Sequence, residues 1–109
     1  MDVVVKRGEF WLVNLDPAVG HEIKKARPCF ILSPDEANQF LDTVVAAPLT
    51  STIRNYPSRV PCVLKRRHGQ IALDQIRCFD KTRLIKKMGK GKEELTKKVF
   101  GILEEYFRY

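Results

Sequence analysis

The chain has 109 residues, of which 44% are hydrophobic, and 20 Lys and Arg against 13 Asp and Glu give it a formal net charge of +7 at pH 7. This length fits one domain over residues 1–109, and the apolar content excludes a disordered tail protein. No apolar run reaches the roughly 20 residues of a membrane helix, and the first residues lack a signal-peptide pattern. Three cysteines cannot close a disulfide framework, so we expect reduced, buried thiols and a cytoplasmic protein.

All of the excess positive charge lies in the second half of the chain. Residues 1–54 carry six basic and seven acidic side chains, whereas residues 55–109 carry fourteen and six. An uneven basic charge suits an anionic partner on one part of the surface. Basic character that serves solubility alone is the alternative, and charge by itself does not decide between the two.

Six segments have strand character, because they are rich in β-branched and aromatic residues or alternate between apolar and polar positions. In chain order they are residues 10–15, 28–32, 43–50, 60–64, 70–73 and 76–79. The polar stretch 18–27 predicts a loop, and Lys65–Gly69 predicts a basic turn. Pro48 predicts that the third strand ends, or lies at a sheet edge, at this point.

Helix signals interrupt and follow these strands. Ser33, with Glu36 three residues later, has the pattern of a capping box and predicts a helix of about two turns through Phe40. Residues 80–84 predict one helical turn, and Gly91 is the expected cap of a closing helix of about four turns. The apolar face of that helix consists of Leu95, Val99, Ile102, Leu103, Tyr106 and Phe107. Five or six strands with two such helices predict a mainly β fold, a small antiparallel barrel with a helix packed on it.

The sequence offers little for a metal, phosphate-loop or cysteine-nucleophile site. The two histidines lie far apart, and no cysteine pair has the spacing of a zinc knuckle. Residues 88–92 form a basic turn without the strand that a phosphate loop requires before it. The three cysteines, Cys29, Cys62 and Cys78, lie in apolar strand patterns that favour burial over catalysis. We therefore predict neither a metal nor a cofactor.

Polar side chains gather instead at the ends of predicted strands, where sites tend to be placed. They are His21 and Glu22 in the first loop, Arg27 at its end, Thr50, Ser51 and Thr52 after a strand, and Asp74 and Gln75 between two strands. Arg27 could bind a phosphate through two hydrogen bonds, and His21 or Asp74 could move a proton to or from a ribose hydroxyl. Each side chain also has an ordinary interpretation as a surface ion pair, a turn residue, a cap or a solvated loop residue.

Three blocks of sequence resemble the MazF/PemK-type toxin endoribonucleases of type II toxin–antitoxin systems. In chain order they are Arg7–Pro17 with Gly20-His21-Glu22 and Arg27-Pro28, then Ala47–Thr52, then Leu73–Arg77. The resemblance covers roughly Lys6 to the last residue. It implies a single toxin domain with the CcdB/Kid-like fold, an SH3-like barrel of five to seven strands with a C-terminal helix.

The resemblance also implies an activity and its partners. Such enzymes work as homodimers, cleave single-stranded RNA at short sequences without a metal, and are inhibited by a cognate antitoxin. The ribose 2′-OH attacks the adjacent phosphate, which leaves a 2′,3′-cyclic phosphate and a 5′-OH.

The family's site residues map onto four positions of this chain. The resemblance implies that Arg27 stabilises the phosphate and acts as the general acid, and that Thr50 positions the scissile phosphate. The PemK-like branch adds Asp74 as the base and His21 as a supporting group. That branch has a second arginine, the proposed general acid, at the position where this chain has Ala72. Arg27 is therefore expected to take a larger part in the general-acid function. An arginine is a poor proton donor because its pKa exceeds about 12.

The remaining polar and basic residues are expected to contact RNA. They are Glu22, Ser51, Thr52 and Gln75 near the site, and Lys65, Arg66 and Arg67 in the basic turn. Unstacked bases can be read in a shallow groove, and the basic residues of the turn and of 86–92 add salt-dependent attraction to phosphates. Two alternatives remain: a non-catalytic nucleic-acid-binding barrel, and a CcdB-like gyrase poison. The second depends on a C-terminal Trp-Gly-Ile, whereas this chain ends in Glu105–Tyr109.

Overall fold

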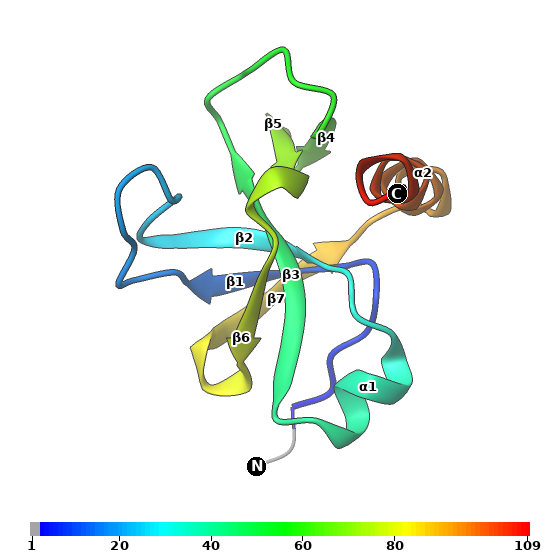
Figure 1. Ribbon diagram of the computed structural model, residues 1–109. Coiled ribbons are helices and arrows are strands. Elements are labelled where there is room, and N and C mark those ends of the chain that lie inside the picture. Colours follow the sequence, from blue (N-terminus) through cyan, green and yellow to red (C-terminus); the bar gives the residue numbers. More distant parts are fainter. Residues whose placement is uncertain (1–2) are drawn as a thin grey trace.

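A curled antiparallel sheet and two helices make up the computed structural model, which describes residues 3–109 (Figure 1). The elements in chain order are β1 (Glu9–Asn14), β2 (Ala26–Ile31), α1 (Asp35–Phe40), β3 (Thr43–Thr50), β4 (Arg59–Leu64), β5 (Arg67–Ala72), the 3-10 turn η1 (Leu73–Gln75), β6 (Arg77–Asp80), the 3-10 turn η2 (Lys81–Arg83), β7 (Leu84–Lys90) and α2 (Glu93–Tyr106). The strand order is β4-β5-β3-β2-β1-β7, and β6 also pairs with β3. The predicted mainly β fold with an inserted and a closing helix is confirmed.

Strand β3 is the centre of the sheet and has neighbours along both of its edges. It pairs with β2 on one side, and on the other side with β6 up to Ala46 and with β5 from Leu49 onward. The prediction that Pro48 marks a strand end or a sheet edge is therefore wrong. Proline is tolerated because it falls between the segments paired with β6 and β5, where its missing N–H removes no ladder bond.

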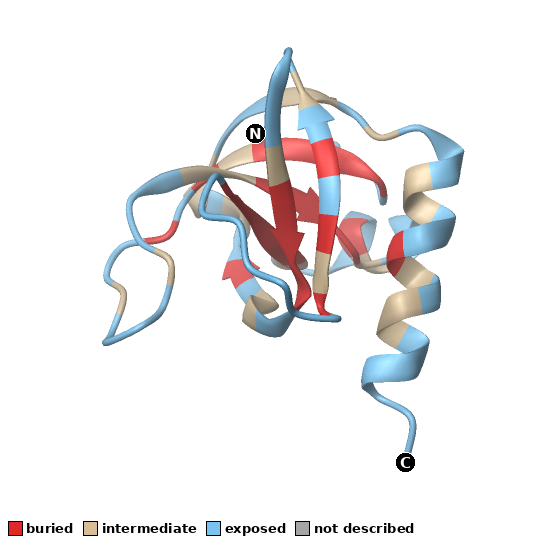
Figure 2. Cartoon of the chain, turned by 90° about the horizontal axis from the view of Figure 1, so that it is seen from above, coloured by how far each residue is buried: buried red, intermediate tan, exposed pale blue. Residues whose placement is uncertain are grey.

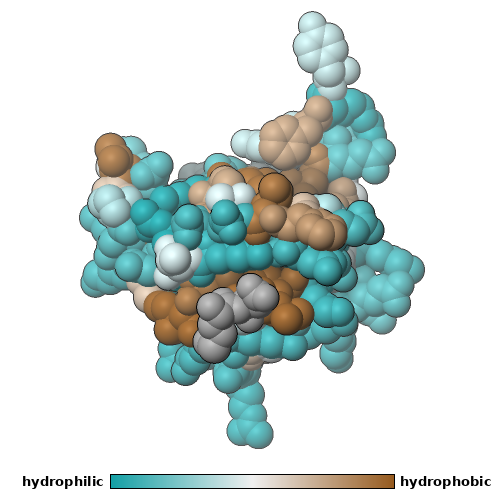
Figure 3. Space-filling model, turned by 90° about the horizontal axis from the view of Figure 1, so that it is seen from below, coloured by the Kyte–Doolittle hydropathy of each residue, from teal (hydrophilic) through white to brown (hydrophobic). Residues whose placement is uncertain are grey.

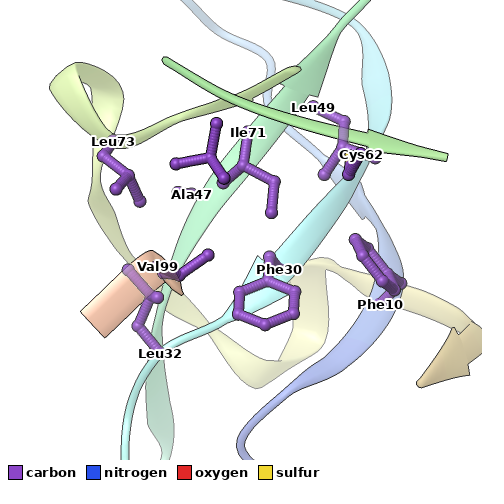
Figure 4. Packing of buried hydrophobic residues seen from close by; sticks show 10 residues of the cluster. Phe10, Phe30, Leu32, Ala47, Leu49, Cys62, Ile71, Leu73 and Val99 are labelled. Carbon is purple, nitrogen blue, oxygen red and sulfur yellow. The ribbon is translucent and has the colours of Figure 1, made fainter. Parts of the chain in front are cut away.

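Two apolar clusters lie on opposite faces of the central strands, because neighbouring residues of a strand point to opposite sides. Phe10, Phe30 and Ile71 belong to the first cluster, which β4, β5 and α2 cover (Figure 4). Trp11 and Cys29, one position away in their strands, belong to the second cluster. The rigid strands between the two clusters carry the polar residues described below at their ends.

Helix α2 lies to one side of the sheet and buries one stripe of its surface (Figure 2). Val99 is fully buried in the first cluster, and Leu95 and Ile102 pack around it. Glu93 and Glu94 stand in the first turn, where negative charge favours the helix dipole. The predicted apolar face is confirmed from Leu95 to Leu103, but Tyr106 and Phe107, also assigned to it, are exposed at the helix end. The helix is capped by Lys92 and not by Gly91. Within residues 3–109, none of the helices combines the length and apolar character needed to cross a membrane.

The predicted capping box before α1 is wrong. The cap residue is Pro34, which makes no side-chain cap bond. The hydroxyl of Ser33 instead donates to Asn38 Oδ1 at 2.5 Å and accepts from the backbone N–H of Val45 at 3.0 Å. Ser33 therefore ties α1 to β3, and the end of this helix at Phe40 is as predicted.

Three other expectations need correction. The loop expected over 18–27 ends earlier, because Ala26 and Arg27 pair with β1 as the start of β2. The basic turn expected over Lys65–Gly69 is only two residues long, because β5 begins at Arg67. Strand β7 was not predicted, because its lysines hide any alternation of apolar and polar residues. Lysines on an edge strand typically protect it from pairing with another chain.

The cysteines are free thiols, and two of the three are buried as expected. Burial raises the pKa of Cys29 to about 12 and that of Cys62 to about 11, so both remain protonated at neutral pH. Cys78 is exposed, and the expectation that it is buried is wrong. It lies on β6 next to Phe79, whose side chain takes the inward position in this strand.

Candidate active site

The register of the central strands brings Arg27 and Thr50 to the same place. Cys29 of β2 lies opposite Pro48 of β3, so continuing this antiparallel register by two residues sets Arg27 level with Thr50. On the other side of β3, Thr50 lies opposite Gln70 of β5. Side chains at opposed positions share a face, with Cβ atoms about 5 Å apart. The printed pairing of β2 with β3 ends at Cys29 and Pro48, and its continuation would place two predicted site residues, 23 positions apart in the sequence, on one face of the sheet.

The hydroxyl of Thr50 is oriented by the loop that follows it. Thr50 is 8% exposed, and its Oγ1 accepts a hydrogen bond of 3.1 Å from the backbone N–H of Thr52. Because its oxygen is the acceptor in this bond, the hydroxyl retains a proton that it can donate. Gly69 permits this arrangement, because a Cβ at that position would lie 2.9 Å from the Thr50 carbonyl oxygen. A side chain at position 69 would push β5 away from Thr50.

Among residues 3–109, the guanidinium of Arg27 has a single hydrogen bond, from Nε to the carbonyl oxygen of Lys24 at 3.3 Å. Within residues 3–109, the ion pairs join other side chains and leave Arg27 without a carboxylate partner. Its terminal nitrogens can therefore donate to a bound anion, and a planar guanidinium suits two oxygens of one phosphate.

Asp74 lies in η1 and is held by two neighbours. Arg59 donates to it through Nε to Oδ1 at 2.7 Å and through Nη2 to Oδ2 at 3.1 Å, and Ser58 Oγ donates to Oδ1 at 2.9 Å. The bonds from Arg59, and then that from Ser58, outweigh partial burial and lower the pKa of Asp74. Asp74 is therefore ionised at neutral pH and is a weak base.

Arg59 is a site residue that the sequence reasoning missed. It is the cross-strand partner of Ala72, the position where the PemK-like branch would carry its second arginine. The structure thus sets a guanidinium opposite Ala72 from the neighbouring strand. Nothing in the sequence near Ala72 signals this, because the pairing of β4 with β5 is what places Arg59 there.

The loop that carries His21 is tied to η1 by Gln75. The amide of Gln75 accepts from the backbone N–H of Ile23 at 2.8 Å and donates to the carbonyl oxygen of His21 at 3.3 Å. Glu22, predicted to bind RNA, accepts from the backbone N–H of Val19 at 2.6 Å and so stabilises its own loop. These bonds hold the backbone of His21 against Gln75, the residue that follows Asp74 in the chain.

The basic turn lies away from this cluster. Lys65 and Arg66 form the tip of the β4–β5 hairpin, whereas Arg59 and Asp74 lie at its other end. Five residue steps along the strand separate the two ends, which is about 17 Å. Arg67 stands at the start of β5, while Ser51 and Thr52 are exposed directly after Thr50. Among residues 3–109, no three His, Cys, Asp or Glu side chains cluster as a metal site requires.

Comparison with known proteins identifies related chains. Residues 6–107 match the family model described as PemK-like, MazF-like toxin of type II toxin-antitoxin system. Endoribonuclease EndoA of Bacillus subtilis is 35% identical over 103 residues, which cover 89% of both chains. MazF of Deinococcus radiodurans has a similar crystal structure, with a TM-score of 0.85 and 27% identity over 99% of this chain and 100% of that one. A mycobacterial endoribonuclease solved in complex with its cognate antitoxin has a TM-score of 0.79 and 24% identity, over 93% of this chain and 92% of that one.

Proposed function

The chain belongs to the PemK-like, MazF-like family of toxins from type II toxin–antitoxin systems, and from this premise we propose how it acts on RNA. It is an endoribonuclease of such a system. We propose that it cleaves single-stranded RNA at short sequences, without a metal ion, and leaves a 2′,3′-cyclic phosphate and a 5′-OH. The residues that carry this chemistry are the cluster at the ends of β2, β3 and β5.

The proposed reaction is attack by the RNA on itself. The ribose 2′-oxygen forms a bond to the adjacent phosphorus, the bond from phosphorus to the 5′-oxygen breaks, and one proton moves from the first oxygen to the second. Arg27 binds two phosphate oxygens and stabilises the charge that grows on them. The Thr50 hydroxyl donates to a phosphate oxygen and sets the geometry of attack.

We assign the proton transfers to the groups around η1. The imidazole of His21 is the side-chain type that exchanges protons most readily near neutral pH. Asp74 is ionised and could accept a proton, but its oxygens already accept bonds from Arg59 and Ser58. We therefore propose His21 as the proton-transfer group, with Asp74 holding Arg59 in place. Arg27, always charged, stabilises the transition state.

One observation carries this proposal: Arg27, free of any carboxylate among the described residues, lies on β2 two residues before Cys29, so the β2–β3 register continued past the Cys29–Pro48 pair leads to Thr50. We expect Arg27→Ala to lower the single-turnover cleavage rate by about 100- to 1000-fold, as loss of a transition-state donor does. Arg27→Lys retains the positive charge but cannot donate to two phosphate oxygens in the same way. Its cleavage rate is expected to lie between those of the parent protein and Arg27→Ala. The measurement uses purified protein in EDTA with a labelled oligonucleotide.

Arg108→Ala is the matched control for this experiment. Arg108 is exposed and pairs with Glu105 near the end of α2. This variant should cleave like the parent protein. If Arg27→Ala cleaves at the parent rate, the assignment is wrong. If the parent protein binds RNA and yields no cyclic-phosphate product, the chain is a binding protein and not the nuclease proposed here.

We further propose a homodimer and a cognate antitoxin as the partners of this chain. Exposed apolar side chains support protein contacts, because Val4, Phe40 and Leu41 border a cleft between the N-terminal segment and α1. Figure 3 views that end of the molecule, where hydrophobic and hydrophilic areas adjoin. Sedimentation of the purified chain, alone and with its antitoxin, tests both partners. A monomer at micromolar concentration contradicts the first, and unchanged cleavage with excess antitoxin contradicts the second.

A further inference from the structure

The loop between β3 and β4 presents an aromatic ring to solvent beside the candidate active site. Tyr56 is 50% exposed, although it lies in a polar loop that starts at Thr50 and ends at Arg59. In Figure 1 this loop projects from one end of the sheet, away from α1. A large exposed aromatic side chain at such a place calls for an explanation, since its ring gains little from folding.

The inner face of this ring rests on a fixed cation. The guanidinium carbon of Arg59 lies 5.1 Å from the centroid of the Tyr56 ring. Arg59 is itself immobilised by its two bonds to Asp74, and its side chain is 8% exposed. The ring is thus supported from one side by an ion pair, and its remaining surface is available for stacking.

The loop that carries the ring is anchored at several points. Gln70 of β5 accepts from the backbone N–H of Arg54 and donates to the Arg54 carbonyl oxygen, both at 3.1 Å. The backbone N–H of Arg59 donates to the carbonyl oxygen of Tyr56 at 3.1 Å. These bonds fix the ring before any ligand arrives, so little ordering entropy is lost on binding.

The position of the ring relates it to the phosphate site. Thr50 lies opposite Gln70, and Arg59 lies opposite Ala72, two residues further along β5. Two strand spacings and two residue steps correspond to about 12 Å between Thr50 and Arg59. A nucleotide close to the one whose phosphate lies at Thr50 could therefore reach the ring.

From these observations we propose that Tyr56 is a stacking platform for a nucleobase of the RNA substrate next to the scissile phosphate. The proposal rests on the function proposed above and adds a base subsite to it. Every base offers a π face to an aromatic ring, and cationic Arg54 and Arg59 on this loop suit the flanking phosphates. Asp74 then holds the cation under the platform, so that one ion pair serves both the phosphate site and the base subsite.

The test replaces the ring and follows both affinity and stacking. Tyr56→Leu keeps an apolar side chain and removes the π face, whereas Tyr56→Phe and Tyr56→Trp retain it. Stacking of one base is worth about 1–3 kcal/mol, so we expect Tyr56→Leu to raise KM about 5- to 100-fold with a smaller change in kcat. Tyr56→Phe and Tyr56→Trp should stay within about threefold of the parent protein.

A fluorescent base reports stacking directly. Once the cleavage sequence is read from the 5′ ends of cut RNA, 2-aminopurine is placed in turn at each base flanking the cut, in oligonucleotides with 2′-deoxyribose at the cleaved position. Binding should quench the fluorescence at one position for the parent protein and Tyr56→Phe, and Tyr56→Leu should abolish that quenching. Tyr109→Leu is the matched control, because Tyr109 is an exposed tyrosine beyond the end of α2.

The outcomes separate this proposal from the proposed function. If the parent protein cleaves RNA and Tyr56→Leu leaves both KM and quenching unchanged, the base subsite is wrong and the nuclease assignment stands. If Tyr56→Leu weakens only the binding of the antitoxin, the ring serves a protein partner and the proposal is overturned. If the parent protein cleaves no RNA, the proposed function fails first. Thermal unfolding of each variant shows that the fold is retained.

Discussion

The ion pair between Arg59 and Asp74 determines what each of these side chains can contribute. Arg59 takes up both carboxylate oxygens, which lowers the pKa of Asp74 and raises that of Arg59 through the same bonds. Neither group is then suited to exchanging protons near neutral pH. The pair instead fixes a charge distribution at the end of the β4–β5 hairpin. The sequence identifies Asp74 as a candidate site residue, but it does not identify Arg59 as its partner.

This pair should make folding stability depend on pH in the acid range. Because the folded-state pKa of Asp74 is lowered, its stabilisation is complete above the usual aspartate pKa near 4 and is lost as the pH falls through the folded-state pKa. Urea unfolding of the parent protein and Asp74→Asn should differ by roughly 1–3 kcal/mol at pH 5 to 7, and this difference should shrink progressively as the pH falls below about 4. Asp42→Asn, on an exposed loop carboxylate, is the control. A difference that persists unchanged to pH 3 contradicts the assignment.

At the scale of elements, apolar patterning predicted most of the fold. The bounds of β3 follow from a continuous apolar run that is buried on both faces, and the inward side of α2 follows from apolar residues at helical spacing. Strand β7 could not be predicted in this way, because an edge strand gains its pairing from the backbone and fills its exposed positions with lysine. Ser33 resembled a helix cap, but in the fold its hydroxyl bonds to Asn38 and β3, and tertiary contacts decided its role.

The β4–β5 hairpin turn contains an unfavourable backbone conformation. Lys65 has φ of 50° and Arg66 has φ of 67°, whereas two-residue turns of this kind favour Asn-Gly. We expect Lys65→Asn with Arg66→Gly to stabilise the protein by about 1–2 kcal/mol, since positive φ costs bulky residues about this much. If both side chains of the turn contact phosphates, the same change makes the dependence of log RNA affinity on log salt shallower by about 1.4.

A control variant that removes a positive charge elsewhere separates the effect on stability from the effect on the salt dependence of RNA binding. Lys97→Asn alters an exposed lysine of α2 that pairs with Glu93, and it should leave the salt slope unchanged. A stabilised turn variant with an unchanged salt slope would show that the basic turn, about 17 Å from Arg59 along the hairpin, takes no part in RNA binding. Thermal unfolding and fluorescence anisotropy at four salt concentrations supply both readouts.

At the scale of the whole molecule, the topology of the sheet assembles the site. His21, Arg27, Thr50 and Asp74 come from both halves of the sequence, and β3, which pairs with β2 on one side and with β5 on the other, connects the elements that carry the proposed site. Residue types at strand ends, together with a family resemblance, suggested these four positions. Arg59, Gln70 and Tyr56 could not be predicted, since strand register and loop anchoring place them, and neither can be read from a single sequence.

The central claim is that this site uses the 2′-hydroxyl of the RNA as the nucleophile. The most direct measurement compares two oligonucleotides that differ only in having ribose or 2′-deoxyribose on the 5′ side of the cleaved phosphate, with product ends identified by mass spectrometry in EDTA. The account predicts cleavage of the ribose form to a 2′,3′-cyclic phosphate and a 5′-OH, and no cleavage of the deoxyribose form at that phosphate. Cleavage of the deoxyribose form at a comparable rate, or products with a 5′-phosphate and a 3′-OH, would contradict it.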